Sequence, residues 1–356
     1  MAVSIKSERE IELMREAGKI LAATHEELKE ALKPGMSTWE IDRLCERIIR
    51  GYGCIPSFKN YQGYPASVCV SINDEVVHGI PKKGRFLQEG DIVSLDTGVI
   101  YKGYQSDAAR TYGIGKISPE AEKLIEVTKQ SFFEGIKFAK AGNHLNDISS
   151  AIQAYAEKFG YGVVRDLVGH GIGTEMHEDP EVPNFSQKRK GIKLQAGMTL
   201  AIEPMINAGG YDVVGLDDDW TVVTEDGSLS AHYENTVLIT DGEPEILSTE
   251  IMRWKMIVKE NSRHVNTGER YEQGCLVKSL AGHDKDELFV ILREEGEYLY
   301  LADGKNRTIG KPKRKNKKHI QFIREKQEEI SRKLQEGIPV EDVEIKTFIR
   351  CFKRQN

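Results

Sequence analysis

Two aspartates, Asp96 and Asp107, are the first residues of this chain whose types and spacing point to chemistry. The sequence from 91 to 113 predicts two strands joined by a tight turn. With the turn centred between Tyr101 and Lys102, the two carboxylates lie directly opposite each other. Paired side chains have Cβ atoms about 5 Å apart, and like charges there destabilise a sheet. A divalent cation ligated by both would offset the repulsion, whereas two solvated aspartates on an exposed face would need no ligand.

Three further segments place side chains that can bind metal near predicted strands. His170 lies in a glycine-rich bend, residues 169–173, whose backbone can approach a ligand closely. Glu203 ends an apolar strand and precedes a proline, so its backbone is extended. Glu234 lies inside the predicted strand 231–240, where a buried carboxylate is costly unless it is paired or bound to metal.

The elements around these residues predict an α/β fold of two similar halves around one sheet. Capping signatures beginning at Ser7 and Ser37 predict two opening helices. Apolar periodicity predicts two more over residues 119–139 and 145–159. Strands are predicted over residues 67–72, 91–97, 108–113, 200–206, 220–224 and 231–240.

The pattern changes near residue 250. Residues 251–270 are predicted to be a linker between a larger part, 1–250, and a tail, 271–356. Short strands separated by glycine and charged turns follow at 276–277, 287–292 and 298–301, which is typical of a small barrel. Two amphipathic helical segments close the chain, with Ile323, Ile330 and Leu334 on the first and Val343, Phe348 and Phe352 on the second.

Composition separates the same two parts. Residues 251–356 hold 24 Lys and Arg against 17 Asp and Glu, while residues 1–250 hold the other 26 and 39. A basic tail on an acidic body predicts two units with different partners. No apolar run is long enough to cross a membrane, and the N-terminus lacks a signal-peptide core, so we expect a cytoplasmic protein without membrane contact.

Residues 1–250 resemble the type I methionine aminopeptidase family. The matching segments follow one another in the family's order and spacing. They are residues 61–65, 77–81, 96–111, 169–173, 177–178, 202–205 and 230–236. The resemblance implies the pita-bread α/β fold, in which two pseudo-symmetric halves face each other across a metal site.

The resemblance also implies a ligand set and a reaction: removal of the initiator methionine from new proteins whose second residue is small. Asp107 and Glu234 would bridge two divalent ions, Co²⁺, Mn²⁺ or Fe²⁺, with Asp96 completing one site and His170 and Glu203 the other. Glu203 would also act as general base. His78 and His177 would donate hydrogen bonds to substrate and oxyanion. His78 taken singly is more often a structural residue, whereas His177 follows His170 by seven residues. The family is commonly monomeric.

The methionine pocket follows from the same resemblance, and its aromatic and thiol groups suit a flexible thioether. Ordinary core packing is the alternative for each of these residues. The pocket residues would be Phe58, Tyr61, Tyr64, Cys69 and Trp220.

Residues from about 271 resemble a KOW-type domain, which implies a small SH3-like barrel with C-terminal helices and an RNA partner at the ribosome. A basic run lies within it and would neutralise phosphates, although a solvated linker is the alternative. The candidate contacts are Lys311, Lys313, Arg314, Lys315, Lys317 and Lys318.

Two other functions compete with this one. A proline-specific relative of the same fold usually has a large additional N-terminal domain, and Asp96 comes too early in the chain for that. An RNA-binding protein on an inactive scaffold would have lost metal ligands, and none of the five is lost here.

Overall fold

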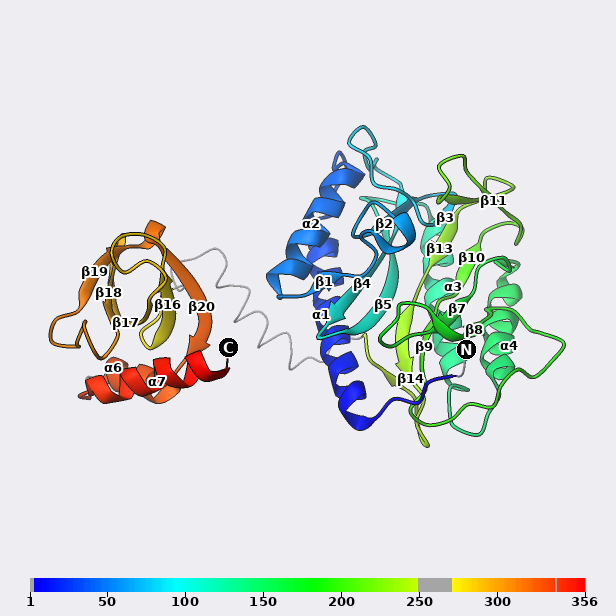
Figure 1. Cartoon of the computed structure of the whole chain (residues 1–356). Helices are drawn as coiled ribbons and strands as arrows, with labels where there is room; N and C mark the ends of the chain where they lie inside the picture. The colour runs from blue at the N-terminus through cyan, green and yellow to red at the C-terminus, as the bar shows by residue number, and fades with distance from the viewer. Residues whose placement is uncertain (1–2, 249–270, 337, 356) are drawn as a thin grey trace. The chain divides into compact units, whose positions relative to one another are not determined.

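A computed structural model of the chain describes residues 3–248, 271–336 and 338–355 (Figure 1). The whole of the predicted linker, 251–270, therefore lies outside the described residues. Contacts divide the chain into two compact units, Met1–Lys255 (unit 1) and Met256–Asn356 (unit 2). None of the described helices combines the length and apolar character needed to cross a bilayer.

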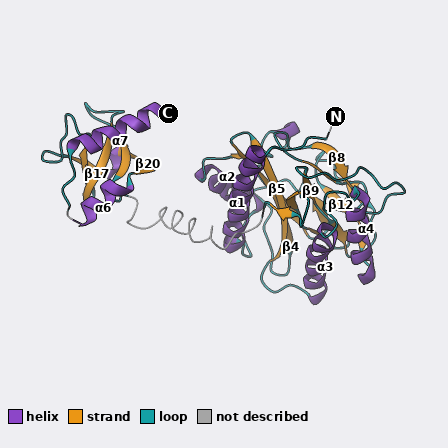
Figure 2. Cartoon of the chain, turned by 90° about the horizontal axis from the view of Figure 1, so that it is seen from below, coloured by secondary structure: helices purple, strands orange, loops and turns teal. Residues whose placement is uncertain are grey.

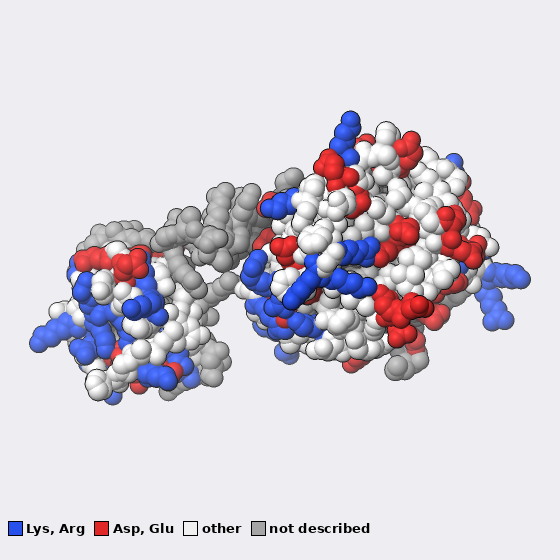
Figure 3. Space-filling view, turned by 90° about the horizontal axis from the view of Figure 1, so that it is seen from above, with Lys and Arg blue, Asp and Glu red and all other residues white. Residues whose placement is uncertain are grey.

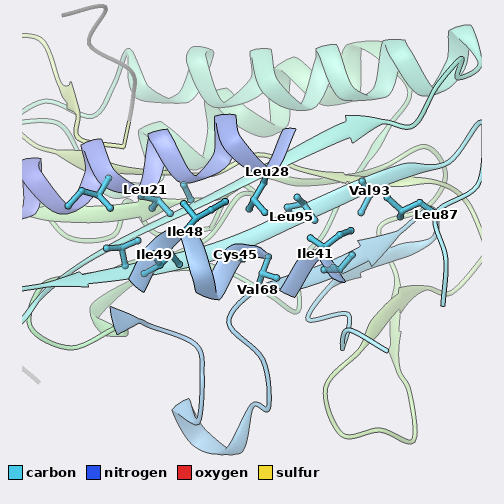
Figure 4. Close-up of a cluster of buried hydrophobic side chains, with 14 of the residues drawn as sticks. Leu21, Leu28, Ile41, Cys45, Ile48, Ile49, Val68, Leu87, Val93 and Leu95 are labelled. Atoms are coloured by element: carbon cyan, nitrogen blue, oxygen red, sulfur yellow. The ribbon is translucent and has the colours of Figure 1, made fainter. Parts of the chain in front are cut away.

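Unit 1 opens with the two predicted helices, α1 (Glu8–Ala31) and α2 (Thr38–Gly51). Each begins in a capping box, at Ser7 and Ser37, which satisfies backbone N–H groups that the first helical turn leaves free. Figure 4 shows how their apolar faces pack against the neighbouring strands through residues such as Leu28 and Leu95. This core fixes the strands that carry the first two aspartates.

Those strands form a four-stranded antiparallel sheet of β1 (Ile55–Pro56), β2 (Cys69–Ile72), β4 (Ile92–Tyr101) and β5 (Tyr104–Gly113). The β4–β5 hairpin is longer than predicted, and Tyr101 pairs with Tyr104. The turn is therefore Lys102–Gly103, one residue later than expected. Both turn residues have positive φ, 48° and 87°, and this conformation favours glycine at the second position.

The second half of unit 1 contains α3 (Pro119–Ile136) and α4 (Leu145–Ala156), and Figure 2 shows this pair apart from α1 and α2. Both helices begin where predicted. Their apolar faces share a core with a five-stranded sheet. Its strands, in spatial order, are β15 (Glu245–Ile246), β14 (Asn235–Leu238), β9 (Thr199–Ile202), β7 (Gly169–Gly171) and β8 (Glu178–Val182).

Two predicted strands are broken, and each break falls at a candidate ligand. The strand 200–206 is divided at Glu203–Pro204 into β9 and β10 (Met205–Asn207), and the strand 231–240 is divided at Tyr233–Glu234 into β13 (Ser230–His232) and β14. The prediction of Glu234 inside a continuous strand is therefore wrong. The remaining pieces form two three-stranded sheets, β13–β10–β6 (Gly162–Val163) and β11 (Val213–Gly215)–β12 (Val222–Thr224)–β3 (Glu75–Val77).

Unit 2 is one antiparallel sheet with two helices. In spatial order its strands are β19 (Lys313–Asn316), β18 (Tyr298–Ala302), β17 (Leu288–Glu295), β16 (Cys275–Ser279) and β20 (Ile320–Lys326). α6 (Glu328–Glu336) and α7 (Asp342–Gln355) pack on one face, and a second apolar cluster covers the other.

Two tail predictions are wrong. The sheet does not close into a barrel among the described residues, because β19 and β20 each pair on one side only. Ile323 lies in β20, not in a helix, while Val343 does lie on α7, where it is exposed. The alternative in which the basic run is a linker does not hold, since the run contains β19.

Buried His25 on α1 makes the stability of unit 1 depend on pH. Its Nε2–H donates to the Ala108 carbonyl at 2.8 Å, and burial lowers its pKa from 6.5 to about 3. Below about pH 6.5 the His25 ring therefore binds a proton in the unfolded chain but not in the folded chain. The free energy of unfolding falls as the pH drops through this range. Between pH 7 and pH 5 this one group should cost about 2 kcal/mol.

We expect His25→Gln, which keeps an N–H donor but cannot titrate, to lose about 2 kcal/mol less stability than the wild type over this interval. Urea unfolding at pH 7 and pH 5, followed by tryptophan fluorescence, measures it. His144→Gln, at a half-buried histidine, is the control and should behave as wild type. Equal pH sensitivity of His25→Gln and wild type would contradict the assignment.

Candidate metal centre

Asp96 and Asp107 lie diagonally across the β4–β5 hairpin, because the shifted turn changes their register. Asp96 pairs with Ala109, and Asp107 pairs with Gly98. Each carboxylate thus faces a position with a small side chain or none, which leaves room on that face. A Cβ on Gly98 would lie 2.8 Å from the Ser57 side chain and 2.9 Å from Met176, so this position tolerates only glycine without movement.

Glu234 is held beside Asp107 by contacts to the backbone. The Glu234 N–H donates to the Ala109 carbonyl at 3.0 Å, and the Arg110 guanidinium donates to the Glu234 carbonyl. The Thr236 hydroxyl bonds both the N–H and the carbonyl of Asp107, at 2.9 and 3.0 Å. The break between β13 and β14 therefore turns a carboxylate toward the hairpin.

His170 and Glu203 approach from the second sheet. The His170 Nδ1–H donates to the Gly171 carbonyl at 2.8 Å, so Nε2 keeps its lone pair. Nε2 lies 3.8 Å from Asp107 Oδ2 and 3.7 Å from Glu203 Oε1. Burial lowers the pKa of His170 to about 3, so the ring is neutral. A neutral imidazole with one nitrogen fixed by a carbonyl is the usual form of a metal ligand.

These residues fit a divalent cation. Ligand atoms of Asp107, His170 and Glu234 lie within 4.8 Å of one another. Burial, with repulsion from Asp107, raises the pKa of Asp96, Glu203 and Glu234 well above the ordinary range. Asp96 Oδ1, Asp107 Oδ1 and Glu234 Oε1 are buried with no hydrogen-bond partner among the described residues. A cation would satisfy these atoms and stabilise the ionised forms.

The two candidate substrate histidines flank this cluster. His177 stacks on Tyr61, whose hydroxyl lies 2.8 Å from His177 Nδ1, and its ring centroid is 4.2 Å from that of His170. His78 has a left-handed φ of 60°, and its ring meets the Trp220 ring edge-on at 6.1 Å. Burial lowers the pKa of His78 to about 4, so this ring is also neutral.

Four of the five pocket candidates form one cluster. Tyr64 and Cys69 are buried, and Phe58 and Trp220 pack against them. The Tyr64 and Trp220 rings meet edge-on at 5.0 Å. Cys69 pairs with Asp96 across β2 and β4, so this cluster adjoins the carboxylates. Tyr61 packs with a different group of residues, on the His177 side.

Two residues that the sequence did not single out also belong to the site. His232 is 2% exposed, its Nε2 lies 3.6 Å from Glu203 Oε2, and neither ring nitrogen has a hydrogen-bond partner in the described part of the chain. Arg110 holds the Glu234 segment and donates to Asn235 Oδ1 at 2.6 Å. In the sequence, both residues lie within three positions of a candidate ligand, Arg110 after Asp107 and His232 before Glu234. A charged or imidazole side chain so close to a candidate ligand is too common to identify a site residue.

The predicted basic run of unit 2 is only partly available to a ligand. Lys313 and Lys315 both pair with Asp284, at 2.8 and 3.0 Å, and Lys315 is buried. Lys317 pairs with Glu294. The members without an ion pair among the described residues are Lys311, Arg314 and Lys318, all exposed.

Comparisons with known proteins agree with this geometry. Residues 12–241 match metallopeptidase family M24. The methionine aminopeptidase of Clostridium acetobutylicum is 61% identical over 246 residues, which are 69% of this chain and 98% of that protein. Methionine aminopeptidase 1 of Bacillus subtilis is 51% identical over 243 residues, 68% of this chain and 98% of that protein.

Among solved structures, the methionine aminopeptidase of Thermotoga maritima superposes with a TM-score of 0.69 at 44% identity, covering 70% of this chain and all of that one. The mixed α/β pita-bread fold predicted for the first 250 residues is thereby confirmed. The match includes all five candidate ligands, and a metallopeptidase family accounts for the buried carboxylates. The chain belongs to metallopeptidase family M24.

Proposed function

We propose that this chain removes the initiator methionine from new polypeptides whose second residue is small, using two divalent ions held by five side chains. The ligands are Asp96, Asp107, His170, Glu203 and Glu234. The observation that carries the proposal is the gathering of four carboxylates and one neutral imidazole at a single site in the interior of unit 1. Identities of 51–61% to proteins named methionine aminopeptidase support this substrate over a proline-specific one.

The donor set favours hard or borderline cations such as Mn²⁺, Fe²⁺ or Co²⁺, because it is rich in oxygen and has no thiolate. When bound, such ions supply Lewis-acid polarisation of the scissile carbonyl and an activated water. The chain provides the rest. Glu203 accepts the proton of the attacking water and returns it to the leaving amine. The His232 ring lies beside Glu203 Oε2 and can hold that carboxylate in place.

His78 and His177 donate to the substrate and to the negative oxygen that develops during attack. With the Tyr61 hydroxyl donating to Nδ1, neutral His177 carries its proton on Nε2, where it can be donated. The cluster of Phe58, Tyr64, Cys69 and Trp220 receives the methionine side chain, since sulfur–aromatic contacts are favourable. Tyr61 acts from the His177 side.

Removing one ligand separates metal binding from folding. We expect Asp107→Asn to lose methionine release by at least about 1000-fold, as loss of a key electrostatic group does. Metal-free wild-type protein carries repulsion that the variant lacks, so the metal-free variant should melt no lower. Adding Mn²⁺ should raise the Tm of the wild type but not of the variant.

Peptide hydrolysis and thermal melts, with and without a chelator, check this. Asp241→Asn, at an exposed surface aspartate, is the matched control and should keep both activity and the metal-induced rise in Tm. Undiminished turnover by Asp107→Asn would refute the assigned centre.

Trp220→Ala tests the methionine pocket. The side chain closes the aromatic cluster, so its loss should lower kcat/KM for a methionyl peptide about 10- to 100-fold, consistent with an aromatic contact of about 1–3 kcal/mol. Metal affinity should not change. Trp39→Ala removes an exposed tryptophan on α2 as a control. Steady-state kinetics with a short methionyl peptide would contradict the pocket if the two variants behaved alike.

We further propose that residues 271–356 bind ribosomal RNA and thereby concentrate the enzyme where its substrates emerge. The excess of Lys and Arg in this part supports the proposal, and Figure 3 shows such side chains gathered on the visible face of unit 2. The KOW resemblance supports it as well. The catalytic chemistry needs none of these residues.

Co-sedimentation with ribosomes tests this second proposal. Full-length protein should pellet with ribosomes at low salt and be released as salt rises, because phosphate contacts exchange for counterions. Residues 1–250, which span the aligned length of shorter relatives, should stay in the supernatant yet hydrolyse free peptides normally. Equal pelleting of both forms would contradict a role for the tail.

A further inference from the structure

A hollow of about 660 Å³ lies on unit 2, at the end of the sheet where β20 begins. It is lined by two aromatic rings, two lysines, an amide and two aliphatic side chains. The lining residues are Tyr271, Leu280, Lys317, Lys318, Ile320, Gln321 and Phe322. The metal-centre chemistry of unit 1 uses none of them.

The aromatic part of the hollow is an accessible pair of rings. Tyr271 and Phe322 meet edge-on with centroids 6.3 Å apart, and both are only partly buried against the second apolar cluster of the sheet. Because both rings are partly exposed and line the hollow, they offer ring surface to a ligand. A planar apolar group such as a nucleobase can stack there.

The polar part of the hollow selects for a negative charge. The Lys317 ammonium lies 5.3 Å from the Tyr271 ring centroid and is also paired with Glu294. Lys318 is exposed and has no ion pair among the described residues, so its ammonium can meet a phosphate. Exposed Gln321 adds an amide that can both donate to and accept from a base edge. Cationic ligands are disfavoured by the two lysines.

We propose that this hollow binds one unpaired nucleotide of RNA, with the base stacked on the Tyr271 ring, edge-on to Phe322, and its phosphate at Lys318. This inference rests on the proposed RNA-binding role of unit 2 and makes it more specific. It assigns the RNA contact to one defined site and not to the whole basic run, because half of the basic side chains in that run are in ion pairs. Duplex RNA cannot use the site fully, because its bases are already stacked and paired.

The test is fluorescence anisotropy of full-length protein with a labelled single-stranded oligoribonucleotide of about 12 nucleotides, a length within single-strand site sizes, and with the same sequence as a duplex. Tyr271→Leu keeps apolar volume but loses the ring, and should weaken single-strand binding roughly 5- to 100-fold. Tyr271→Phe keeps the ring and should bind as wild type. Duplex affinity should be unchanged in both.

The lysines provide a second, independent readout. Lys318→Gln should lower the slope of log affinity against log salt by about one for the single strand. Lys311→Gln removes an exposed charge from the same run outside the hollow, and should leave the difference between single strand and duplex intact. All variants should hydrolyse a free methionyl peptide at the wild-type rate, because unit 1 is unchanged, and an unchanged circular dichroism spectrum and thermal melt of each variant check that unit 2 stays folded.

Failure of this inference differs from failure of the broader proposal. If wild-type protein binds RNA but Tyr271→Leu and Lys318→Gln bind like it, the hollow is not the site and RNA binding lies elsewhere on unit 2. If wild-type protein binds neither RNA form, both proposals fall. If polyglutamate displaces RNA equally well from the wild type and from Tyr271→Leu, the hollow binds acidic groups through its lysines and not a base through its ring. That result would identify an acidic-peptide site and would also overturn the inference.

Discussion

Mutual repulsion among four enclosed carboxylates is the constraint on which unit 1 depends. Two unit charges 4 Å apart repel by about 4 kcal/mol at the effective dielectric typical of a protein surface. Burial adds to the cost, and it raises the pKa of Asp96, Glu203 and Glu234. A sequence that folds into this arrangement needs a scaffold strong enough to hold these groups together, and protons or a cation to neutralise them.

The scaffold holds the ligands mainly through backbone contacts. The long β4–β5 hairpin holds Asp96 and Asp107 diagonally opposite each other, and Thr236 bonds the Asp107 backbone to the second sheet. Arg110 holds the segment that carries Glu234. Because these bonds leave the carboxylate oxygens free, the rigidity of the site does not compete with metal binding. The apolar cores of both helix pairs lie behind it.

Unit 2 pairs opposite charges, whereas the site in unit 1 gathers like charges. Its lysines are numerous, but Lys313, Lys315 and Lys317 are each in an ion pair within the same unit, with Lys313 and Lys315 sharing one carboxylate. Buried Lys315, which also bonds the Ala281 carbonyl, helps to hold the loop that carries Asp284 against β19. A run of basic residues in sequence therefore overstates the charge offered to a partner. The exposed remainder, together with the aromatic pair of Tyr271 and Phe322, is a smaller and more selective surface.

The sequence by itself determined the starts of helices α1 to α4, the α/β class and the candidate ligands, because capping boxes, apolar periodicity and isolated carboxylates are local signals. It also contained the family's ordered motifs. Tertiary structure alone decided the one-residue shift of the hairpin turn and the break at Glu234, whereas Pro204 already marks the break at Glu203 in the sequence. It also decided the approach of His232 to Glu203 and which lysines are paired. These features depend on contacts between residues far apart in the chain, and local propensity carries no information about such contacts.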